Sequence, residues 1–143
     1  MNENERGVIQ HQERAKQLIL FEDMKYDRKI TPTDFDAVIE YKDVAWVVCE
    51  VKYKDTTLPY GQELALNRFV DDMWRAGKHV LAIVAEHEID NANENIMLKD
   101  CIVRKSKYNH EDWISKPEKI TVKQCVDKFL EVMDERIKGR SVV

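Results

Sequence analysis

Two adjacent stretches in the first half of the chain constrain its fold more than any other feature. Residues 34–41 (DFDAVIEY) and 45–53 (AWVVCEVKY) are rich in Val, Ile, Phe, Tyr and Trp, and only three residues separate them. This composition is typical of β-strands, and so short a connection predicts an antiparallel hairpin. Both predicted strands also carry charged residues, which a purely structural sheet does not need.

Regular apolar spacing and apolar runs predict five further elements around this hairpin. They are helices over 5–24, 60–76 and 121–139, and strands over 79–85 and 101–105. The run HVLAIVA at 79–85 is almost wholly apolar, which indicates a central strand that is covered on both faces. The order of elements therefore predicts an α/β fold, with a mixed central β-sheet flanked by helices.

Local signals predict where some of these elements end. Gly77 and Gly139 are expected to stop the second and third helices, because glycine readily adopts the conformation that ends a helix. Thr121, followed three residues later by Gln124, forms a capping-box pattern at the start of the third helix. The polar residues 25–33 are expected to form a connection with room for a short edge strand.

Composition bounds the class of protein. The 143 residues are 43% hydrophobic and 35% charged, with 4 Gly and 3 Pro, which is typical of a single globular domain over 1–143. No apolar run approaches the roughly 20 residues of a membrane span, and the polar N-terminus lacks the apolar core of a signal peptide. We therefore expect a cytoplasmic protein that does not contact a membrane. The net charge of −4 restricts any nucleic-acid surface to a local patch.

The cysteines and histidines indicate no metal centre of the zinc type. Cys49, Cys101 and Cys125 are far apart in the sequence and form no CxxC motif, so they are expected to be reduced, partly buried thiols. The four histidines share no spacing typical of metal ligands.

The charged residues of the hairpin are arranged in register. Asp34 and Asp36 stand two residues apart in the first strand and therefore share a face, as do Glu50 and Lys52 in the second. A turn centred on Asp43 brings Asp36 opposite Glu50, and the same register sets Lys52 opposite Asp34. Two opposed carboxylates repel each other, so we expect one of them to keep its proton unless a divalent cation lies between them.

This pattern indicates metal-assisted hydrolysis of a phosphodiester. Mg²⁺ takes oxygen ligands and often uses only one or two carboxylates, together with water and phosphate. Lys52 beside a metal-bound water could orient that water, help to deprotonate it, or neutralise charge on a phosphate. The alternative is that the charges form ordinary pairs on a solvated strand face. Their placement in register, on adjacent strands and inside apolar runs, favours the site.

The stretch DFDAVIEYKDVAWVVCEVKYK resembles the core motif of the PD-(D/E)XK nuclease superfamily, in which one strand carries an Asp and the next carries Glu-x-Lys. Asp36 and the sequence Glu50-Val51-Lys52 match this motif, although PTD stands where the motif has Pro-Asp. The resemblance covers roughly residues 5–86 and implies a restriction-endonuclease-like αβββαβ core. It implies Asp36, Glu50 and the carbonyl of Val51 as ligands of Mg²⁺ or Mn²⁺. Lys52 would position or activate water.

The resemblance also implies supporting residues. Holliday-junction-resolvase-like and phage-type members place a Gln at the start of the helix after the Glu-x-Lys strand, and Gln62 matches it. Some members supply another acid from the first helix, for which Glu13 and Glu22 are candidates, and Asp34 would tune the site from beside it. His87 could face the same cleft. Each of these five residues has an alternative as a solvated surface residue.

Basic residues near the predicted site could supply nucleic-acid contacts. Lys54, Arg104, Lys105, Lys107 and Tyr108 could hold phosphates and stack a base, or could form a solvated strand edge. We expect a Mg²⁺- or Mn²⁺-dependent endonuclease that acts on DNA rather than RNA, with structure-selective or weak specificity, and that can form a homodimer. The alternatives are a silent or partner-regulated accessory module that binds nucleic acid, and an RNA-directed nuclease.

Overall fold

The computed structural model describes residues 12–141. Contacts divide the chain into two compact units, Met1–Pro32 and Thr33–Val143, and each unit is described by itself. The expectation of one domain over 1–143 stays a prediction. Within the described part of the chain, no helix combines the length and the apolar character that crossing a bilayer requires.

The helix predicted over 5–24 is wrong for most of its described length. Helix α1 spans only Gln12–Ala15, and the first residues of the predicted helix lie outside the described part. Leu18 and Ile19 are 84% and 83% exposed. The physical reason is that four apolar residues follow one another at 18–21, which gives a helix no single apolar stripe to bury. Short helices without tertiary packing are marginal in water.

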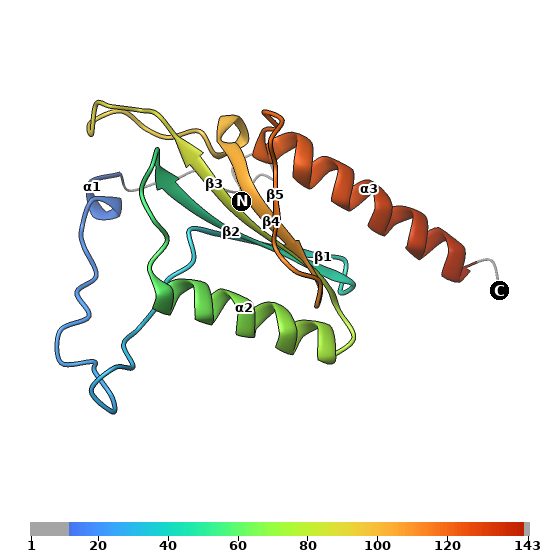
Figure 1. The fold of residues 1–143 in the computed structure, drawn as a ribbon, viewed down its shortest axis with the longest axis horizontal. Coiled ribbons are helices and arrows are strands. Elements are labelled where there is room, and N and C mark those ends of the chain that lie inside the picture. The colour runs from blue at the N-terminus through green and yellow to red at the C-terminus, as the bar shows by residue number, and fades with distance from the viewer. Residues whose placement is uncertain (1–11, 142–143) are drawn as a thin grey trace. The chain divides into compact units, whose positions relative to one another are not determined.

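A five-stranded mixed β-sheet forms the centre of the second unit. Its strands are β1 (Ala37–Tyr41), β2 (Ala45–Tyr53), β3 (His79–His87), β4 (Ile102–Tyr108) and β5 (Ile114–Ser115). They lie side by side in the order β1-β2-β3-β4-β5 (Figure 1). Strands β2 and β3 run parallel, and the other neighbouring pairs are antiparallel. The predicted mixed sheet is thus confirmed, with β3 at its centre.

The β1–β2 hairpin has the predicted register. Ala37 pairs with Cys49, which sets the preceding residue, Asp36, opposite Glu50. The first strand is shorter than predicted, because β1 begins only at Ala37. Asp34 and Asp36 therefore lie in the segment that leads into the strand, and the predicted pairing of Asp34 within the ladder is not formed.

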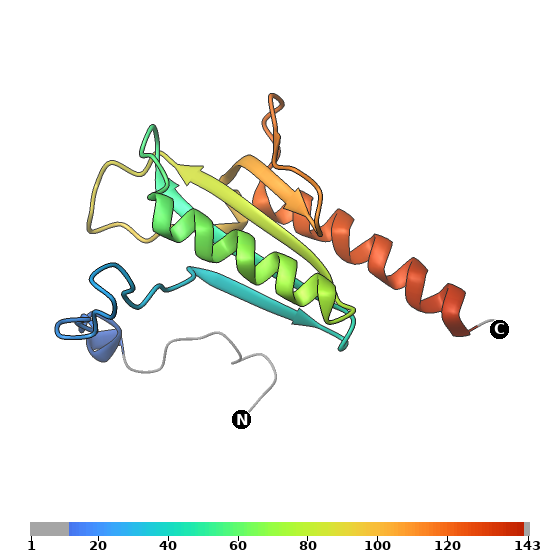
Figure 2. The ribbon, with the colours of Figure 1, turned by 60° about the horizontal axis from the view of Figure 1, so that its bottom comes forward.

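Helices cover both faces of the sheet (Figure 2). Helix α2 (Tyr60–Arg75) packs on one face and helix α3 (Val122–Ser141) on the other, and a short 3₁₀ helix, η2 (Leu98–Asp100), precedes β4. The core under α2 consists of Val48, Leu58, Leu66, Val70, Val80, Ala82 and Val84. The core under α3 contains Ala45, Val47, Cys49, Leu81, Ile83, Ala85, Val103, Val126, Phe129 and Met133. Even-numbered residues of β2 and β3 therefore face α2, and odd-numbered residues face α3.

The three cysteines all belong to the core under α3. Cys49 and Cys101 are buried, Cys125 is half-buried, and all three are free thiols. Burial raises the pKa of the Cys49 thiol to about 12. The expectation of partly buried thiols is confirmed, and their reduced state stays a prediction.

The ends of the helices agree with the sequence signals at two of three positions. The backbone N–H of Gln124 donates to Thr121 Oγ1 at 3.1 Å, and the N–H of Thr121 donates back to Gln124 Oε1 at 3.0 Å, which is a reciprocal capping box. Helix α2 ends before Gly77, whose φ is +91°. The prediction for Gly139 is wrong, because α3 continues to Ser141. Gly139 does not adopt the positive φ that ends a helix at Gly77.

The expected αβββαβ core is only partly present in the described chain. That core has three strands between its two helices, whereas in the described chain two strands, β1 and β2, precede α2. Residues 25–33 contain one isolated bridge, in which Tyr26 and Ile30 exchange two backbone hydrogen bonds of 2.7 Å. So tight a turn leaves no length for a strand. The strand predicted over 101–105 is longer than expected and reaches Tyr108 as β4.

Two glycine substitutions test the helix ends. In Gly139→Ala, the added Cβ meets open space inside α3, so we expect the free energy of unfolding to rise by up to about 1 kcal/mol. In Gly77→Ala, the space is also open, but the positive φ strains any L-residue, so we expect a loss of about 1 kcal/mol. Urea denaturation followed by circular dichroism measures both. A destabilised Gly139→Ala variant would contradict the continuation of α3 to Ser141.

Candidate active site

Strand β2 carries two predicted site residues on the face that α2 covers. Glu50 and Lys52 have even numbers and therefore share this face with Val48, which belongs to the core under α2. Glu50 is only 2% exposed, whereas Lys52 is half-buried. A carboxyl group thus lies at the edge of an apolar core, where an isolated charge is costly.

Asp36 closes the end of the hairpin with its side chain. Its Oδ2 accepts a hydrogen bond of 2.7 Å from the backbone N–H of Val51. A side chain thereby satisfies this amide, and the regular β1–β2 ladder ends at Ala37. The contact holds the Asp36 carboxylate next to Glu50, in the opposition that the sequence predicts.

The surroundings raise the pKa of Glu50 to about 7. The largest cause is burial of the carboxyl group, and the next is the negative charge of Asp36. Asp34 also raises this pKa, and the ammonium of Lys52 lowers it. Near neutral pH, the Glu50 carboxyl is therefore divided between its protonated and ionised forms. The direction of this shift agrees with the expectation that one of the opposed carboxyl groups holds its proton.

Two buried oxygen atoms of the predicted site have no hydrogen-bond partner in the described part of the chain. They are Glu50 Oε1, from β2, and Gln62 Oε1, from the first turn of α2. A buried acceptor without a partner costs about 1–3 kcal/mol, and native proteins contain few of them. Carboxylate and amide oxygens are ligands of hard divalent cations and acceptors for ordered water. Both atoms therefore indicate a place for a bound ion or for water.

The oxygen atoms at this place are of the chemical type that Mg²⁺ and Mn²⁺ prefer. Asp36 and Glu50 provide carboxylate oxygens from neighbouring segments of one hairpin. Among residues 12–141, no group of three or more His, Cys, Asp or Glu side chains could hold a metal ion. A cation held by two carboxylates would take its remaining ligands from water and phosphate, as Mg²⁺ commonly does.

Two of the predicted nucleic-acid contacts, Lys107 and Tyr108, make contacts within the protein. Lys107 is 8% exposed, and its Nζ donates to the Glu111 carbonyl at 2.7 Å and lies 3.7 Å from an Asp71 oxygen. The Lys107 ammonium therefore makes its polar contacts inside the protein, with the residues that pack beside β4. Tyr108 lies on the α3 face, where its hydroxyl is 3.0 Å from His79 Nδ1. The Lys107 ammonium is therefore not exposed for phosphate, whereas Tyr108 is half-buried and its stacking on a base stays a prediction.

Arg104 and Lys105 lie on the α2 face, and each binds a carboxylate. Arg104 Nη2 is 3.0 Å from Glu86 Oε2, and Lys105 Nζ is 2.7 Å from Glu63 Oε1. The Lys105 ammonium also lies 4.7 Å from the centre of the Trp113 ring. Sequence reasoning missed the two acidic partners. Glu63 stands directly after Gln62, and Glu86 directly after the apolar run of β3, but neither position by itself indicates a partner.

A pocket of about 410 Å³ adjoins this pair of cations. Glu63, Val84 and Glu86 line it, together with Arg104 and Lys105. Val84 is the neighbour of Glu50 in the pairing of β2 with β3. The pocket therefore lies on the same face of the sheet as the candidate site and beside it.

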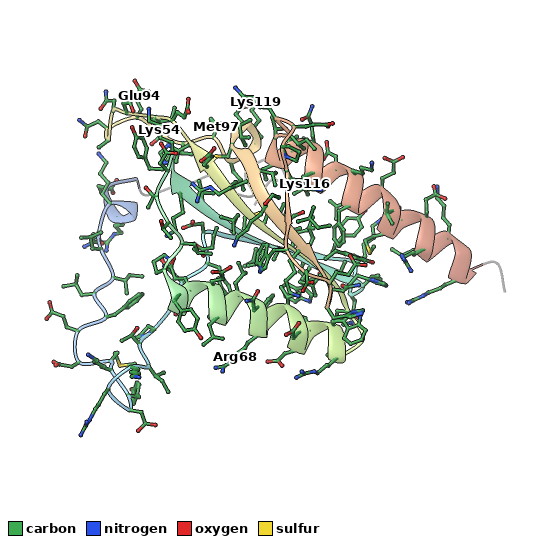
Figure 3. The ribbon with its side chains drawn as sticks, viewed as in Figure 1. Lys54, Arg68, Glu94, Met97, Lys116 and Lys119 are labelled. Carbon is green, nitrogen blue, oxygen red and sulfur yellow. The ribbon has the colours of Figure 1, made fainter. Side chains whose placement is uncertain are left out.

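Lys54 and His87 lie near the carboxyl ends of β2 and β3. Lys54 directly follows β2, at the end of the sheet where Glu94 also lies (Figure 3). His87 has an odd number and belongs to the opposite face from Glu50. Its Nδ1 accepts a hydrogen bond of 3.1 Å from the N–H of Ile89. The structure thus places His87 apart from the α2 face.

The remaining predicted site residues have roles that stay predictions. Asp34 is exposed in the segment before β1, and its negative charge acts on Glu50 as described above. Glu13 and Glu22 belong to the N-terminal unit. The Val51 amide binds Asp36, and the Val51 carbonyl as a metal ligand stays a prediction.

Comparisons with protein-family models, with curated proteins and with solved structures gave no match. The resemblance to the PD-(D/E)XK motif therefore depends on the residues of this chain alone. Any statement about function must come from the chemistry of the α2 face.

The raised pKa of Glu50 predicts how stability depends on pH in metal-free protein. Its pKa rises from 4.5 to about 7 on folding, so the folded state binds this proton more tightly. The resulting stabilisation is complete below about pH 4.5 and is lost as the pH rises through about 7. The Glu50→Gln variant lacks this titration. Its free energy of unfolding, relative to that of the wild type, should therefore increase between pH 4.5 and pH 8 by up to about 3 kcal/mol.

Urea denaturation in the presence of EDTA, at both pH values, measures this difference. Glu131→Gln, which changes an exposed glutamate of α3, is the matched control and should follow the wild type. Parallel pH profiles for Glu50→Gln and the wild type would show that the pKa of Glu50 is not raised.

Proposed function

We propose that this protein is a divalent-metal-dependent nuclease of the PD-(D/E)XK type that hydrolyses phosphodiester bonds in DNA. One observation carries the proposal. Glu50 Oε1 and Gln62 Oε1 are buried and have no hydrogen-bond partner within residues 12–141, on the face that also carries Lys52, with Asp36 held beside Glu50. A structural role would favour satisfied acceptors, whereas a site for a cation and an attacking water needs unsatisfied ones.

The arrangement of elements supports this proposal. A β1–β2 hairpin carries the Asp and Glu-x-Lys positions, α2 follows, and β3 returns parallel to β2. We infer that these elements correspond to the later part of a restriction-endonuclease-like core. Strands β4 and β5 and helix α3 would be additions to that core.

Each residue of the site has a proposed role. Asp36 and Glu50 would hold Mg²⁺ or Mn²⁺, which supplies Lewis acidity at the phosphate and lowers the pKa of bound water. Gln62 Oε1 would accept a hydrogen bond from the attacking water and orient it. The Lys52 ammonium would neutralise the charge that develops on the phosphate. Loss of the Glu50 proton is needed before this carboxylate can bind the cation.

The nature of the substrate and the assembly state are further parts of the proposal. DNA is proposed from the resemblance alone, and RNA is its direct competitor. The apolar stripe of α3 includes Val126, Phe129 and Met133, which are buried in the core under α3. Core packing therefore accounts for this stripe, and it does not support the expected homodimer.

A cleavage assay tests the proposed function. Wild type, Lys52→Ala and Glu50→Gln are incubated with Mg²⁺ or Mn²⁺ on single-stranded, duplex, flap and four-way-junction DNA, and on matched RNA. We expect metal-dependent cleavage of DNA, and a loss of roughly 100-fold or more in both variants, as for removal of catalytic groups in other enzymes. Arg68→Ala is the control, because Arg68 projects from α2 away from the sheet (Figure 3).

Circular dichroism establishes that each variant is folded. Absence of cleavage of every substrate with either metal would refute the enzyme and favour the accessory module. Binding of the same nucleic acids without cleavage would then support that alternative. Cleavage that survives in folded Glu50→Gln would remove this carboxylate from the mechanism.

A further inference from the structure

Lys52 has an acidic neighbour with which it does not pair. Lys52 of β2 and Glu86 of β3 are partners in the parallel register, and both face α2. Neighbouring strands lie about 4.8 Å apart, so an ammonium and a carboxylate at such positions normally attract each other. Glu86 Oε2 instead lies 3.0 Å from Arg104 Nη2, and no salt bridge of Lys52 occurs within residues 12–141. In the structure, Glu86 therefore pairs with Arg104 rather than with Lys52.

A β-bulge in β4 supplies that cation. Val84 pairs with Lys105, but the next residue, Ala85, pairs with Val103, so that Arg104 is the extra residue of β4. A bulge sets two residues of one strand against one residue of its neighbour and redirects a side chain. Two consecutive residues, Arg104 and Lys105, therefore both reach acidic partners on the α2 side of the sheet.

The Arg104 side chain is held at two points. Its Nη1 donates to the Thr56 carbonyl at 2.8 Å, while its Nη2 binds Glu86. The side chains of Arg104 and Glu86 are 27% and 33% exposed, so the pair is largely withdrawn from water. The planar guanidinium is suited to such a fixed, two-point contact, which the compact lysine ammonium cannot reproduce.

We propose that Arg104 is a positioning residue for Lys52. By binding Glu86, it prevents this carboxylate from capturing the Lys52 ammonium, and it leaves Lys52 free to act on a phosphate. This inference rests on the proposed function, because it takes Lys52 to be a catalytic residue. It replaces the expectation that Arg104 itself binds phosphate.

Four variants test this inference. Arg104→Ala should lower the cleavage rate at saturating substrate by roughly tenfold, the factor that corresponds to about 1.4 kcal/mol in the activation barrier. Glu86→Gln alone should leave the rate nearly unchanged. The double variant Arg104→Ala/Glu86→Gln should recover to within about threefold of Glu86→Gln, since the competing carboxylate is gone. Arg104→Lys keeps a cation that can still pair with Glu86 but cannot make both contacts, so it should lose less activity than Arg104→Ala.

Substrate affinity separates positioning from direct phosphate binding. The dissociation constant for DNA, measured with Ca²⁺ in place of Mg²⁺ to prevent cleavage, should change no more in Arg104→Ala than in Arg68→Ala. Arg68→Ala removes the same charge from the outer side of α2 (Figure 3). A large loss of affinity in Arg104→Ala that Glu86→Gln does not restore would overturn the proposal, because it would make Arg104 a phosphate ligand.

Crystal structures of the variants give a readout that does not depend on activity. In Arg104→Ala, the Lys52 Nζ should move to within about 4 Å of a Glu86 oxygen, the usual limit of a salt bridge. In the double variant, the two side chains should stay apart. If Lys52 keeps its wild-type position in Arg104→Ala, the proposal is wrong. Arg104→Gln, which keeps more of the side-chain volume, replaces Arg104→Ala if the latter does not fold.

The two proposals can fail separately. If the wild type cleaves no substrate but the Lys52–Glu86 pair forms in Arg104→Ala, the nuclease is refuted and the structural role of Arg104 is supported. If the wild type cleaves DNA but the double variant does not recover, the nuclease stands and the positioning role is refuted.

Discussion

The burial of one carboxyl group, that of Glu50, is the constraint on which the candidate site depends. Strand β2 carries this group into the space beneath α2, where it is 2% exposed and where its surroundings raise its pKa to about 7. Burial is the largest cause and the charge of Asp36 the next, and a hydrogen bond from the Val51 amide holds the Asp36 side chain in place. The hairpin therefore holds two carboxyl groups together at a cost to stability, which a bound cation would offset.

Strands β2, β3 and β4 and helix α2 supply the charged side chains around this group. Arg104 pairs with Glu86 and Lys105 pairs with Glu63, so these two cations of β4 each neutralise one acid beside the site. Lys52 remains without a salt bridge among the described residues, next to the carboxyl that most needs an opposite charge. Under the proposed function, the same arrangement would let a protein with a net charge of −4 bring a polyanion to an acidic site. Its surface need not be basic throughout, provided that the acids near the reactive groups are neutralised.

Most of the fold follows from local patterns that the sequence displays. Alternation in β2 and β3 determines which residues face each helix, and the three-residue connection determines that Asp36 stands opposite Glu50. Thr121 and Gln124 begin α3 as their capping pattern predicts. These features depend on residues close together in the chain, and the period of a strand or helix makes them visible. The helix predicted over 5–24 is wrong for residues 16–24, and the stop at Gly139 is wrong, since apolar content and a glycine permit those features without requiring them.

The sequence by itself therefore determined the carboxylate pair, the lysine beside it and the faces of the sheet that carry them. Only the tertiary structure decided which cation meets which acid. Arg104 reaches Glu86 because a bulge in β4 shifts the register by one residue, and Lys107 is buried because its position in β4 points it beneath α2. Such partnerships join residues that are 18 to 42 positions apart. They depend on how whole strands align, a property that no short stretch of sequence contains.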